Sequence, residues 1–158
     1  MATIPLTRRG AEKLKDELHR LKTVERHAVI QAIAEARAQG DLSENAEYEA
    51  AKDKQAFIEG RILHIDGQLA AAQIIDPADV DGGGRIVFGT TVVLEEEATG
   101  QEVTYQIVGD DEADIRAGRI SVSSPIARAI VGKSEGDVVD VTAPGGRRSY
   151  EIVAVSYG

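Results

Sequence analysis

Two acidic residues, Asp41 and Glu44, lie three positions apart in a short stretch between two long helical patterns. Carboxylate oxygens are the ligands that hard divalent cations such as Mg²⁺ prefer in proteins. Two of them make only a weak site, which leaves most of the coordination to water or to a partner. One interpretation is therefore that the pair acts inside a partner that already holds one Mg²⁺ and a phosphodiester. There the two carboxylates would help to bind a second Mg²⁺.

The commoner interpretation of such a pattern is purely structural. The segment Asp41-Leu42-Ser43-Glu44 has the form of a capping box, in which the first acid caps a helix and the glutamate reaches back to it. Acidic side chains also suit the positive end of a helix dipole. If Asp41 is held in this way, its oxygens are partly occupied, which weakens it as a metal ligand.

Two amphipathic helices must position this stretch. Apolar residues recur at helical spacing over Leu14–Ala36 and again over Tyr48–Ile74. Gly40 is the expected helix stop, and Asp41 or Ser43 is the expected start of the second helix. A short break between two such helices predicts an antiparallel hairpin, with the acidic pair at its far end.

The two helical arms differ in regularity. In the first arm, eight residues separate Leu21 from Val29 where a heptad has seven, which predicts a stutter or a bend near Glu25–Ala28. The second arm is regular, with small or polar seam residues near the tip and aliphatic ones near the base. Its seam residues are Glu44, Tyr48, Ala51, Gln55, Ile58, Ile62, Ile65, Leu69 and Ala72. We therefore expect a rod that is tight at its base and looser at its tip.

Proline and glycine separate the hairpin from a second domain. We expect residues 1–76 to form an antiparallel coiled-coil hairpin, 77–84 a linker, and 85–158 a small domain. From Arg85 onward the apolar period changes to two, which predicts short antiparallel strands. The expected strands are Arg85–Phe88, Thr90–Glu95, Glu102–Val108, Arg119–Val122, Asp137–Thr142 and Arg148–Ser156. Ser124 as N-cap, Pro125 and a closing Gly132 predict one short helix, so the expected fold class is α+β.

Composition narrows the class of partner. The chain has 158 residues, a formal net charge of −9 and no cysteine. This charge argues against general nucleic-acid binding, which depends on many Lys and Arg contacts to phosphate. We therefore look for a protein partner first. The missing cysteines, the start without a signal-peptide core and the absence of a long apolar run lead us to expect a cytoplasmic protein without membrane contact.

Other kinds of chemistry find little support in the sequence. No two of the three histidines have the i, i+4 spacing of a helical metal site, so we expect them to be solvated. The serines between Ser121 and Ser124 have no histidine in their domain, which excludes a histidine-activated serine nucleophile. The acidic run Asp110–Asp114 lacks the spacing of a calcium loop and is expected to be a solvated loop.

Two segments resemble signatures of the bacterial Gre transcript-cleavage factors. The stretch from Glu35 to Lys54 resembles the family's tip signature, and Ser123–Asp140 with Pro144-Gly145-Gly146 resembles its C-terminal signature. The resemblance extends from Pro5 to Ser156 and is strongest to the family's A type. It implies a coiled-coil hairpin and a C-terminal domain similar to the FK506-binding proteins.

The resemblance also implies an activity and roles for residues. Such factors dock on bacterial RNA polymerase at its secondary channel and induce cleavage of backtracked RNA in the polymerase's own active site, so they are not enzymes alone. Asp41 and Glu44 correspond to the acidic pair that binds and orients the catalytic Mg²⁺ and water, with none bound tightly by the free protein. Asn45, Glu47 and Tyr48 match the tip signature in supporting roles. Ser124, Pro125 and Ile126 match the docking segment, although Ile126 is equally suited to the core.

Further expectations concern the surroundings of the tip. Arg37, Lys52 and Lys54 lie just behind it and are candidates to hold phosphates near the nascent RNA 3′ end; otherwise they are solvated charges. We expect a monomer. Three alternatives remain: a relative that blocks cleavage, which would carry a different acidic tip; a prolyl isomerase, which the scarcity of aromatic residues disfavours; and a structural coiled-coil adaptor.

Overall fold

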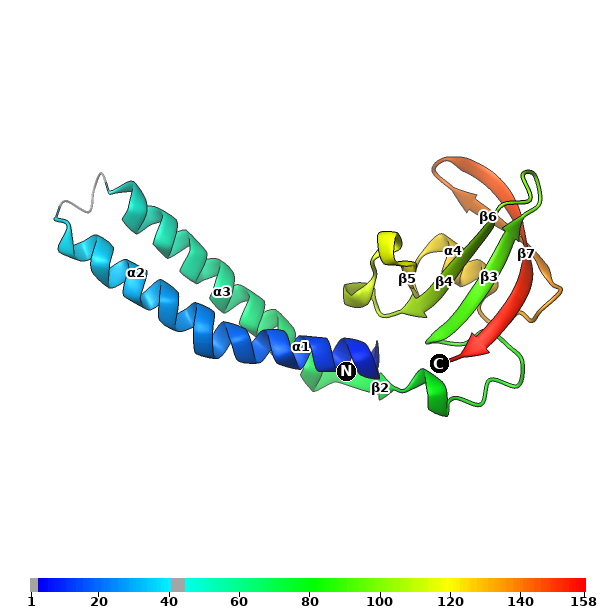
Figure 1. The fold of residues 1–158 in the computed structure, drawn as a ribbon, viewed down its shortest axis with the longest axis horizontal. Helices are drawn as coiled ribbons and strands as arrows, with labels where there is room; N and C mark the ends of the chain where they lie inside the picture. The colour runs from blue at the N-terminus through cyan, green and yellow to red at the C-terminus, as the bar shows by residue number, and fades with distance from the viewer. Residues whose placement is uncertain (1–2, 41–44) are drawn as a thin grey trace. The chain divides into compact units, whose positions relative to one another are not determined.

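The chain folds into two compact units, which together give an α+β fold (Figure 1). The structure is a computed structural model that describes residues 3–40 and 45–158. The first unit is the helical hairpin Ala11–Ala71, and the second combines the N-terminal residues up to Gly10 with Ala72–Gly158. The predicted fold class is confirmed in its main features, a helical hairpin followed by a mostly-strand domain with one short helix.

The hairpin consists of two helical arms joined by a buried seam. The first arm contains α1 (Arg8–Arg20), a π-helical turn (Leu21–Glu25) and α2 (Arg26–Ala38), and the second arm is α3 (Ala46–Ala71). The buried hydrophobic residues are Ala11, Leu14, Leu21, Val29, Ile33 and Ala36 in the first arm, and Ala51, Ile58, Ile62 and Ile65 in the second. Tyr48 and Gln55, nearer the tip, are half-buried. The predicted change from a loose tip to a tight base is confirmed only in part, because Ala36 near the tip is buried whereas Leu69 and Ala72 at the base are half-buried.

The π-helical turn accounts for the irregular spacing of the first arm. The backbone N–H of Arg26 donates to the carbonyl of Leu21, five residues earlier. A π turn accommodates one extra residue, so Leu21 and Val29 both remain buried although eight residues separate them. The predicted slip is confirmed, but it lies over Leu21–Glu25, which overlaps the expected region Glu25–Ala28 only at Glu25.

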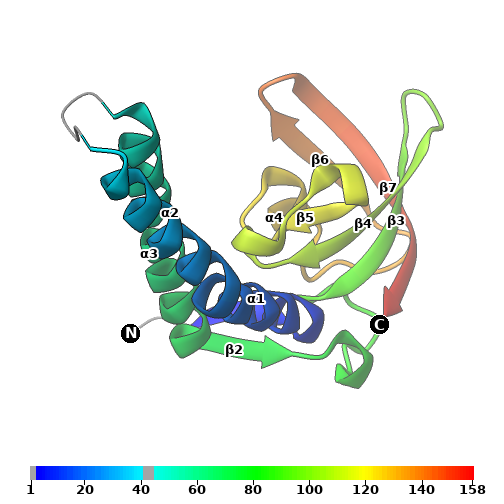
Figure 2. The same cartoon turned by 60° about the vertical axis from the view of Figure 1, so that its left-hand side comes forward.

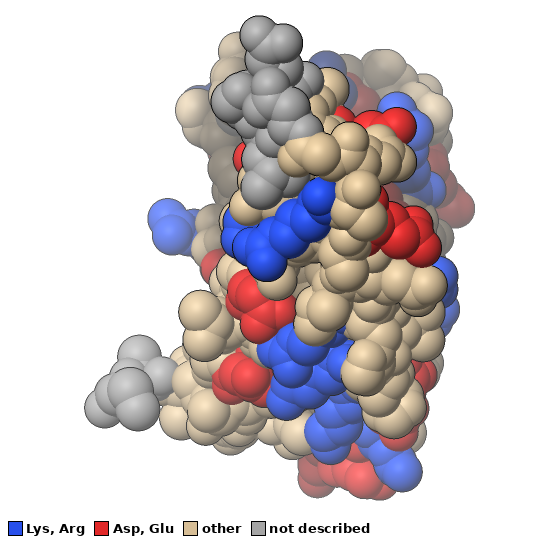
Figure 3. All heavy atoms as spheres, turned by 90° about the vertical axis from the view of Figure 1, so that its left-hand side faces the viewer, with Lys and Arg blue, Asp and Glu red and all other residues tan. Residues whose placement is uncertain are grey.

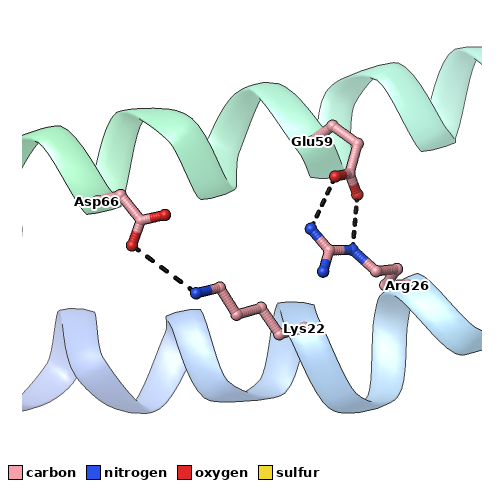
Figure 4. A network of polar contacts seen from close by, with 4 residues as sticks. All are labelled: Lys22, Arg26, Glu59 and Asp66. Carbon is pink, nitrogen blue, oxygen red and sulfur yellow. Dashed lines mark hydrogen bonds and ion pairs between the residues drawn. The ribbon is translucent and has the colours of Figure 1, made fainter.

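Ion pairs join the two arms beside this turn. Arg26 makes a bidentate contact with Glu59, with Nε–Oε2 and Nη2–Oε1 distances of 3.0 and 2.7 Å, and Lys22 lies 3.9 Å from Asp66 (Figure 4). A second bidentate contact, of reversed polarity, joins Arg61 of α3 to Glu17 of α1 at 2.5 and 2.9 Å. Two planar pairs of opposite polarity favour a single register between the arms.

At the base of the hairpin, the second helix ends earlier than predicted. The second helix stops at Ala71, and residues Ala72–Ile75 form a strand, β2, which pairs in parallel with β1 (Ile4–Thr7). The helical pattern predicted to continue to Ile74 was therefore wrong over its last residues. Thr7 caps α1, because its Oγ1 accepts a hydrogen bond of 3.0 Å from the backbone N–H of Gly10.

The second unit is built on a five-stranded sheet with the order β5-β4-β3-β7-β6 (Figure 2). Its strands are β3 (Thr90–Glu96), β4 (Glu102–Val108), β5 (Arg119–Ser121), β6 (Val138–Ala143) and β7 (Gly146–Tyr157), and its helix is α4 (Pro125–Ile130). Ala127 and Ile130 of α4 complete a core with Leu94, Ile107 and Ile152 of the sheet. Five predicted strands are confirmed, as are the Ser124 cap and the helix.

Two expectations for this unit were wrong. Arg85–Phe88 forms no strand; Arg85 makes only an isolated bridge with Ser134. The sheet is also not wholly antiparallel, because β5 pairs in parallel with β4.

The predicted linker packs within the second unit. Pro77–Asp79 forms a 3₁₀ turn, in which the Asp76 side chain accepts from the N–H of Ala78 at 3.1 Å. A Cβ at Gly82 would lie 2.4 Å from the Tyr157 ring, so glycine permits this close approach. Residues 77–84 are therefore grouped with the strands that follow, although the prediction gave them the role of a separate linker.

We predict that the Glu17–Arg61 pair stabilises the protein in a pH-dependent manner. The hydrogen bond from Arg61 lowers the pKa of Glu17 below its ordinary value of about 4.5. This stabilisation is therefore complete above about pH 4.5 and is lost as the pH falls through the lowered folded-state pKa. Because the pair is partly exposed, Glu17→Gln should lower the free energy of unfolding by only about 0.5 kcal/mol at pH 7.

The measurement is denaturant unfolding followed by helical circular dichroism at pH 7 and pH 3. Asp53→Asn is the matched control, because it removes an exposed carboxylate of α3 that pairs with none of the described residues. A difference between wild type and Glu17→Gln that persists unchanged at pH 3 would contradict the prediction.

Candidate functional site

The site predicted from the sequence lies at the end of the hairpin. Asp41 and Glu44 are outside the described residues, so their positions as catalytic and metal-binding residues stay a prediction. The structure describes both residues that flank the segment, Gly40 and Asn45. These two residues show how each helix ends and therefore what the segment connects.

The first arm ends as predicted. The N–H groups of Gln39 and Gly40 donate to the carbonyls of Ala36 and Arg37 at 3.2 and 3.3 Å, which tightens the last turn. Gly40 has a φ of 109°, in the region that favours glycine. A residue with a side chain would be strained at this position, so Gly40 ends the helix.

Asn45 joins the ends of the two helices. Its Oδ1 accepts a hydrogen bond of 3.0 Å from the backbone N–H of Tyr48, so Asn45 is the N-cap of α3. Its Nδ2 donates a hydrogen bond of 2.8 Å to the carbonyl of Ala36 near the end of α2. One side chain therefore satisfies orphan backbone groups of both helices. The prediction that α3 starts at Asp41 or Ser43 was wrong, because the helix starts at Ala46 and Asn45 caps it.

Tyr48 has a role beyond packing in the seam. Its ring is half-buried, and the guanidinium carbon of Arg37 lies 5.9 Å from the ring centroid. This distance fits a cation–π contact between the two arms. Arg37 is exposed along its remaining surface, so the contact orients a charged group without burying it.

The other predicted tip residues are exposed. Lys52 donates to Gln55 Oε1 at 3.3 Å, and Lys54 and Glu47 face solvent. Figure 3 shows the tip end of the hairpin, where positive and negative side chains are interspersed.

No metal cluster is found in the part of the chain that the structure describes. Over residues 3–40 and 45–158, no three His, Asp or Glu side chains converge as ligands. The three histidines are exposed, which confirms that they are solvated.

The predicted docking segment lies at the start of α4. Ser124 Oγ accepts from the N–H of Ala127 at 3.3 Å, Pro125 is exposed, and Ile126 is half-buried against the core. The three residues thus differ in what they offer a partner. Pro125 presents the most free surface, whereas Ser124 and Ile126 mainly fix the position of the helix.

The acidic loop after β4 is not simply solvated, as the sequence suggested. Glu112 accepts hydrogen bonds of 3.0 Å from the backbone N–H groups of Thr7 and Gly109, and another from the Thr7 hydroxyl. Asp110 accepts hydrogen bonds from the hydroxyls of Ser121 and Ser123. Sequence reasoning missed these roles, because the donors are separated from their acceptors by up to 105 residues.

The sheet of the second unit has a small hollow, which is a candidate for the proline pocket that a prolyl isomerase would need. Its volume is about 190 Å³. It is lined by Glu96, Gln101, Val103, Tyr105, Arg148 and Tyr150. Burial raises the pKa of Tyr105, with a smaller contribution from Tyr150. A hollow this small, with several polar groups, is a poor match for the apolar pocket that proline binding needs.

None of the helices among the described residues is both long and apolar enough to cross a membrane. Fold and site together define a factor that carries a helical hairpin, with a charged end, on a mostly-strand domain. Family models match both parts: "Transcription elongation factor, N-terminal" over residues 4–74 and "Transcription elongation factor, GreA/GreB, C-term" over residues 81–157. The chain belongs to the GreA/GreB family of transcription elongation factors.

Individual relatives agree with this assignment. The chain is 69% identical to transcription elongation factor GreA of Verminephrobacter eiseniae and 69% identical to that of Ralstonia nicotianae, each over 157 residues and 99% of both chains. Among solved structures, Gfh1 of Thermus aquaticus is 30% identical over 100% of both chains, with a TM-score of 0.44.

We predict that Asn45 holds the hairpin closed through two separable hydrogen bonds. Asn45→Ala removes both and should lower the free energy of unfolding by about 1 kcal/mol. Asn45→Asp keeps the acceptor for the Tyr48 N–H but loses the donor to the Ala36 carbonyl, so its loss should be smaller.

Amide hydrogen exchange separates the two contributions. The Tyr48 amide should exchange faster in Asn45→Ala than in wild type, and should remain protected in Asn45→Asp. Equal protection of this amide in wild type and Asn45→Ala would show that the cap is unimportant.

Proposed function

We propose that this protein binds bacterial RNA polymerase at its secondary channel and stimulates endonucleolytic cleavage of backtracked nascent RNA, which rescues arrested complexes. The single observation that carries the proposal is the full-length 69% identity to proteins named transcription elongation factor GreA. In this protein the acidic pair occupies the connection between the two helix ends that Asn45 joins. The chain thus supplies two carboxylates, and the polymerase supplies the rest of the active site.

The chemistry of the donor set fits Mg²⁺. Asp41 and Glu44 would hold it through carboxylate oxygens, and two such ligands leave room for ligands from the polymerase and for water. When bound in a two-metal site, Mg²⁺ lowers the pKa of an attacking water and stabilises the leaving oxygen. The two carboxylates orient that water toward the RNA phosphodiester, and neither forms a covalent bond with it.

The supporting residues lie on the two helix ends that flank the pair in the sequence. Asn45 fixes the two helix ends, and Tyr48 holds Arg37 against the second arm. Arg37, Lys52 and Lys54 supply positive charges for phosphates near the RNA 3′ end, and Glu47 adds an exposed carboxylate beside them. Their small number agrees with local contact to RNA rather than general nucleic-acid binding.

The second unit anchors the factor. Ser124, Pro125 and Ile126 form the docking segment, in which exposed Pro125 makes the direct contact. The FK506-binding-protein likeness of this domain remains a prediction. The factor works as a monomer in the bacterial cytoplasm, where transcription takes place.

Each of the three alternative functions is less well supported than the proposed one. A cleavage-blocking relative would carry a different acidic tip, whereas this chain carries both Asp41 and Glu44. A prolyl isomerase needs an apolar pocket, and the hollow beside Tyr105 is small and polar. A structural adaptor would use the pair only as helix caps, and the cap of α3 is Asn45.

We predict that Asp41→Asn combined with Glu44→Gln abolishes stimulated cleavage while polymerase binding is retained. Loss of both carboxylates should slow cleavage of a stalled complex by at least about a hundredfold. The measurement is RNA cleavage in stalled elongation complexes with Mg²⁺, at factor concentrations that saturate binding.

Glu49→Gln combined with Asp53→Asn is the matched control, since it removes two exposed negative charges from α3 outside the tip segment. Cleavage by the control should equal that of wild type. The proposed function is wrong if the tip variant stimulates cleavage at the wild-type rate. It is also wrong if the variant loses helix content instead.

We predict a smaller effect for the basic residues. Lys52→Gln combined with Lys54→Gln should slow cleavage about fivefold, which corresponds to ~1 kcal/mol. The effect should shrink as salt is raised, because these charges are exposed. Arg37 is left unchanged because its contact with Tyr48 also joins the two arms.

Lys13→Gln combined with Lys15→Gln removes the same charge from the exposed surface of α1 and serves as control. An equal loss of cleavage in both double variants would point to overall charge rather than to contact with RNA near the tip.

A further inference from the structure

A carboxylate outside the predicted docking segment organises the turn that leads into it. Asp110, in the 3₁₀ turn after β4, accepts hydrogen bonds from the hydroxyls of Ser121 and Ser123, the latter at 2.7 Å. The two hydroxyl oxygens lie 2.8 Å apart, and the backbone N–H of Ser123 donates to Ser121 Oγ at 3.1 Å. One acidic side chain thus joins two serines on the segment between β5 and α4.

This network fixes the backbone immediately before α4. The N–H of Ser124 donates to the Ser121 carbonyl at 2.9 Å, which closes a tight turn over these four residues. The N–H of Val122, within the turn, donates to the Val108 carbonyl at 2.8 Å and ties the turn to β4. Ser124 then caps α4 through its own hydroxyl.

The electrostatics favour a charged Asp110. Hydrogen bonds from Ser121 and then Ser123 lower the pKa of Asp110, and the positive charge of Arg128 adds to the effect. At neutral pH the carboxylate is therefore ionised and can only accept hydrogen bonds. Both hydroxyls are drawn toward it, which limits the conformations open to the turn.

We propose that Asp110 is a positioning residue for polymerase docking, which holds the Ser121–Ser124 turn so that exposed Pro125 is presented in one orientation. This inference rests on the proposed docking role of Ser124, Pro125 and Ile126. The partner surface is that of RNA polymerase, and Asp110 acts through the turn rather than by direct contact. Preorganising a binding loop raises affinity because less conformational entropy is lost on binding.

The second unit contains a matched control. Asp140 of β6 accepts hydrogen bonds from Ser149 Oγ, at 2.5 Å, and from Arg147, and these hydrogen bonds lower its pKa. It is an exposed aspartate with a hydroxyl donor, as Asp110 is, but its donors belong to β7 rather than to the turn before α4. Asp110→Asn and Asp140→Asn therefore make the same chemical change in two different networks.

The experiment measures the Kd of each full-length variant for RNA polymerase and its saturated rate of stimulated RNA cleavage. Asp110→Asn should raise Kd about fivefold, with the effect falling on Kd rather than on the saturated rate. Asp140→Asn should change Kd less than about twofold. Removing both hydroxyls, by Ser121→Ala with Ser123→Ala, should add little further loss to Asp110→Asn, since these residues act as one network.

Three outcomes would overturn the positioning role. The first is a wild-type Kd for Asp110→Asn when Pro125→Ala weakens binding. The second is an equal loss of affinity in Asp110→Asn and Asp140→Asn. The third is a lowered melting temperature and saturated rate in Asp110→Asn, which would indicate general damage to the fold. If Pro125→Ala binds as tightly as wild type, the docking assignment itself fails, and this result is distinguishable from the other three.

Discussion

The hydrogen bonds of Asn45 are the constraint on which the functional end of the hairpin depends. One amide group accepts from the first turn of α3 and donates to the last turn of α2, so the two helices end at a fixed separation. The residues between Gly40 and Asn45 connect these two ends, and the acidic pair is among them. One side chain thus links the end of α2 to the start of α3.

Contacts along the rest of the hairpin fix the register between its two arms. The bidentate pairs of Arg26 with Glu59 and of Glu17 with Arg61 favour one register, and the π turn between Glu17 and Arg26 absorbs the extra residue. Without the π turn, the apolar stripe of the first arm would rotate out of the seam after Leu21. The spacing of apolar residues revealed the slip, because buried positions follow the helix period directly. The spacing did not predict a π turn in particular, since a bend in the helix can also accommodate one extra residue.

Prediction from the sequence succeeded where structure follows local pattern. Alternating strands, the cap by Ser124 and the glycine stop at Gly40 were all found, because each depends on residues close in the chain. The β1–β2 pair was missed because its partners, such as Ile4 and Ala72, are far apart in sequence. The helical spacing of α3 also continues into the residues of β2, so only tertiary pairing shows where the helix ends. The parallel pairing of β5 with β4 was missed for another reason, because alternation predicts a strand but not the direction in which it pairs.

A further limit is that the sequence does not show which acidic residues accept hydrogen bonds from distant segments of their own chain. Asp110 and Glu112 look like solvated acids, yet hydroxyl and amide donors from distant segments occupy their oxygens. A carboxylate whose oxygens are occupied by donors of its own chain has few left for a metal or a substrate. The structural interpretation of Asp41 required the N-cap position of α3, and Asn45 occupies that position. The N-cap of α3 therefore does not depend on Asp41 or Glu44.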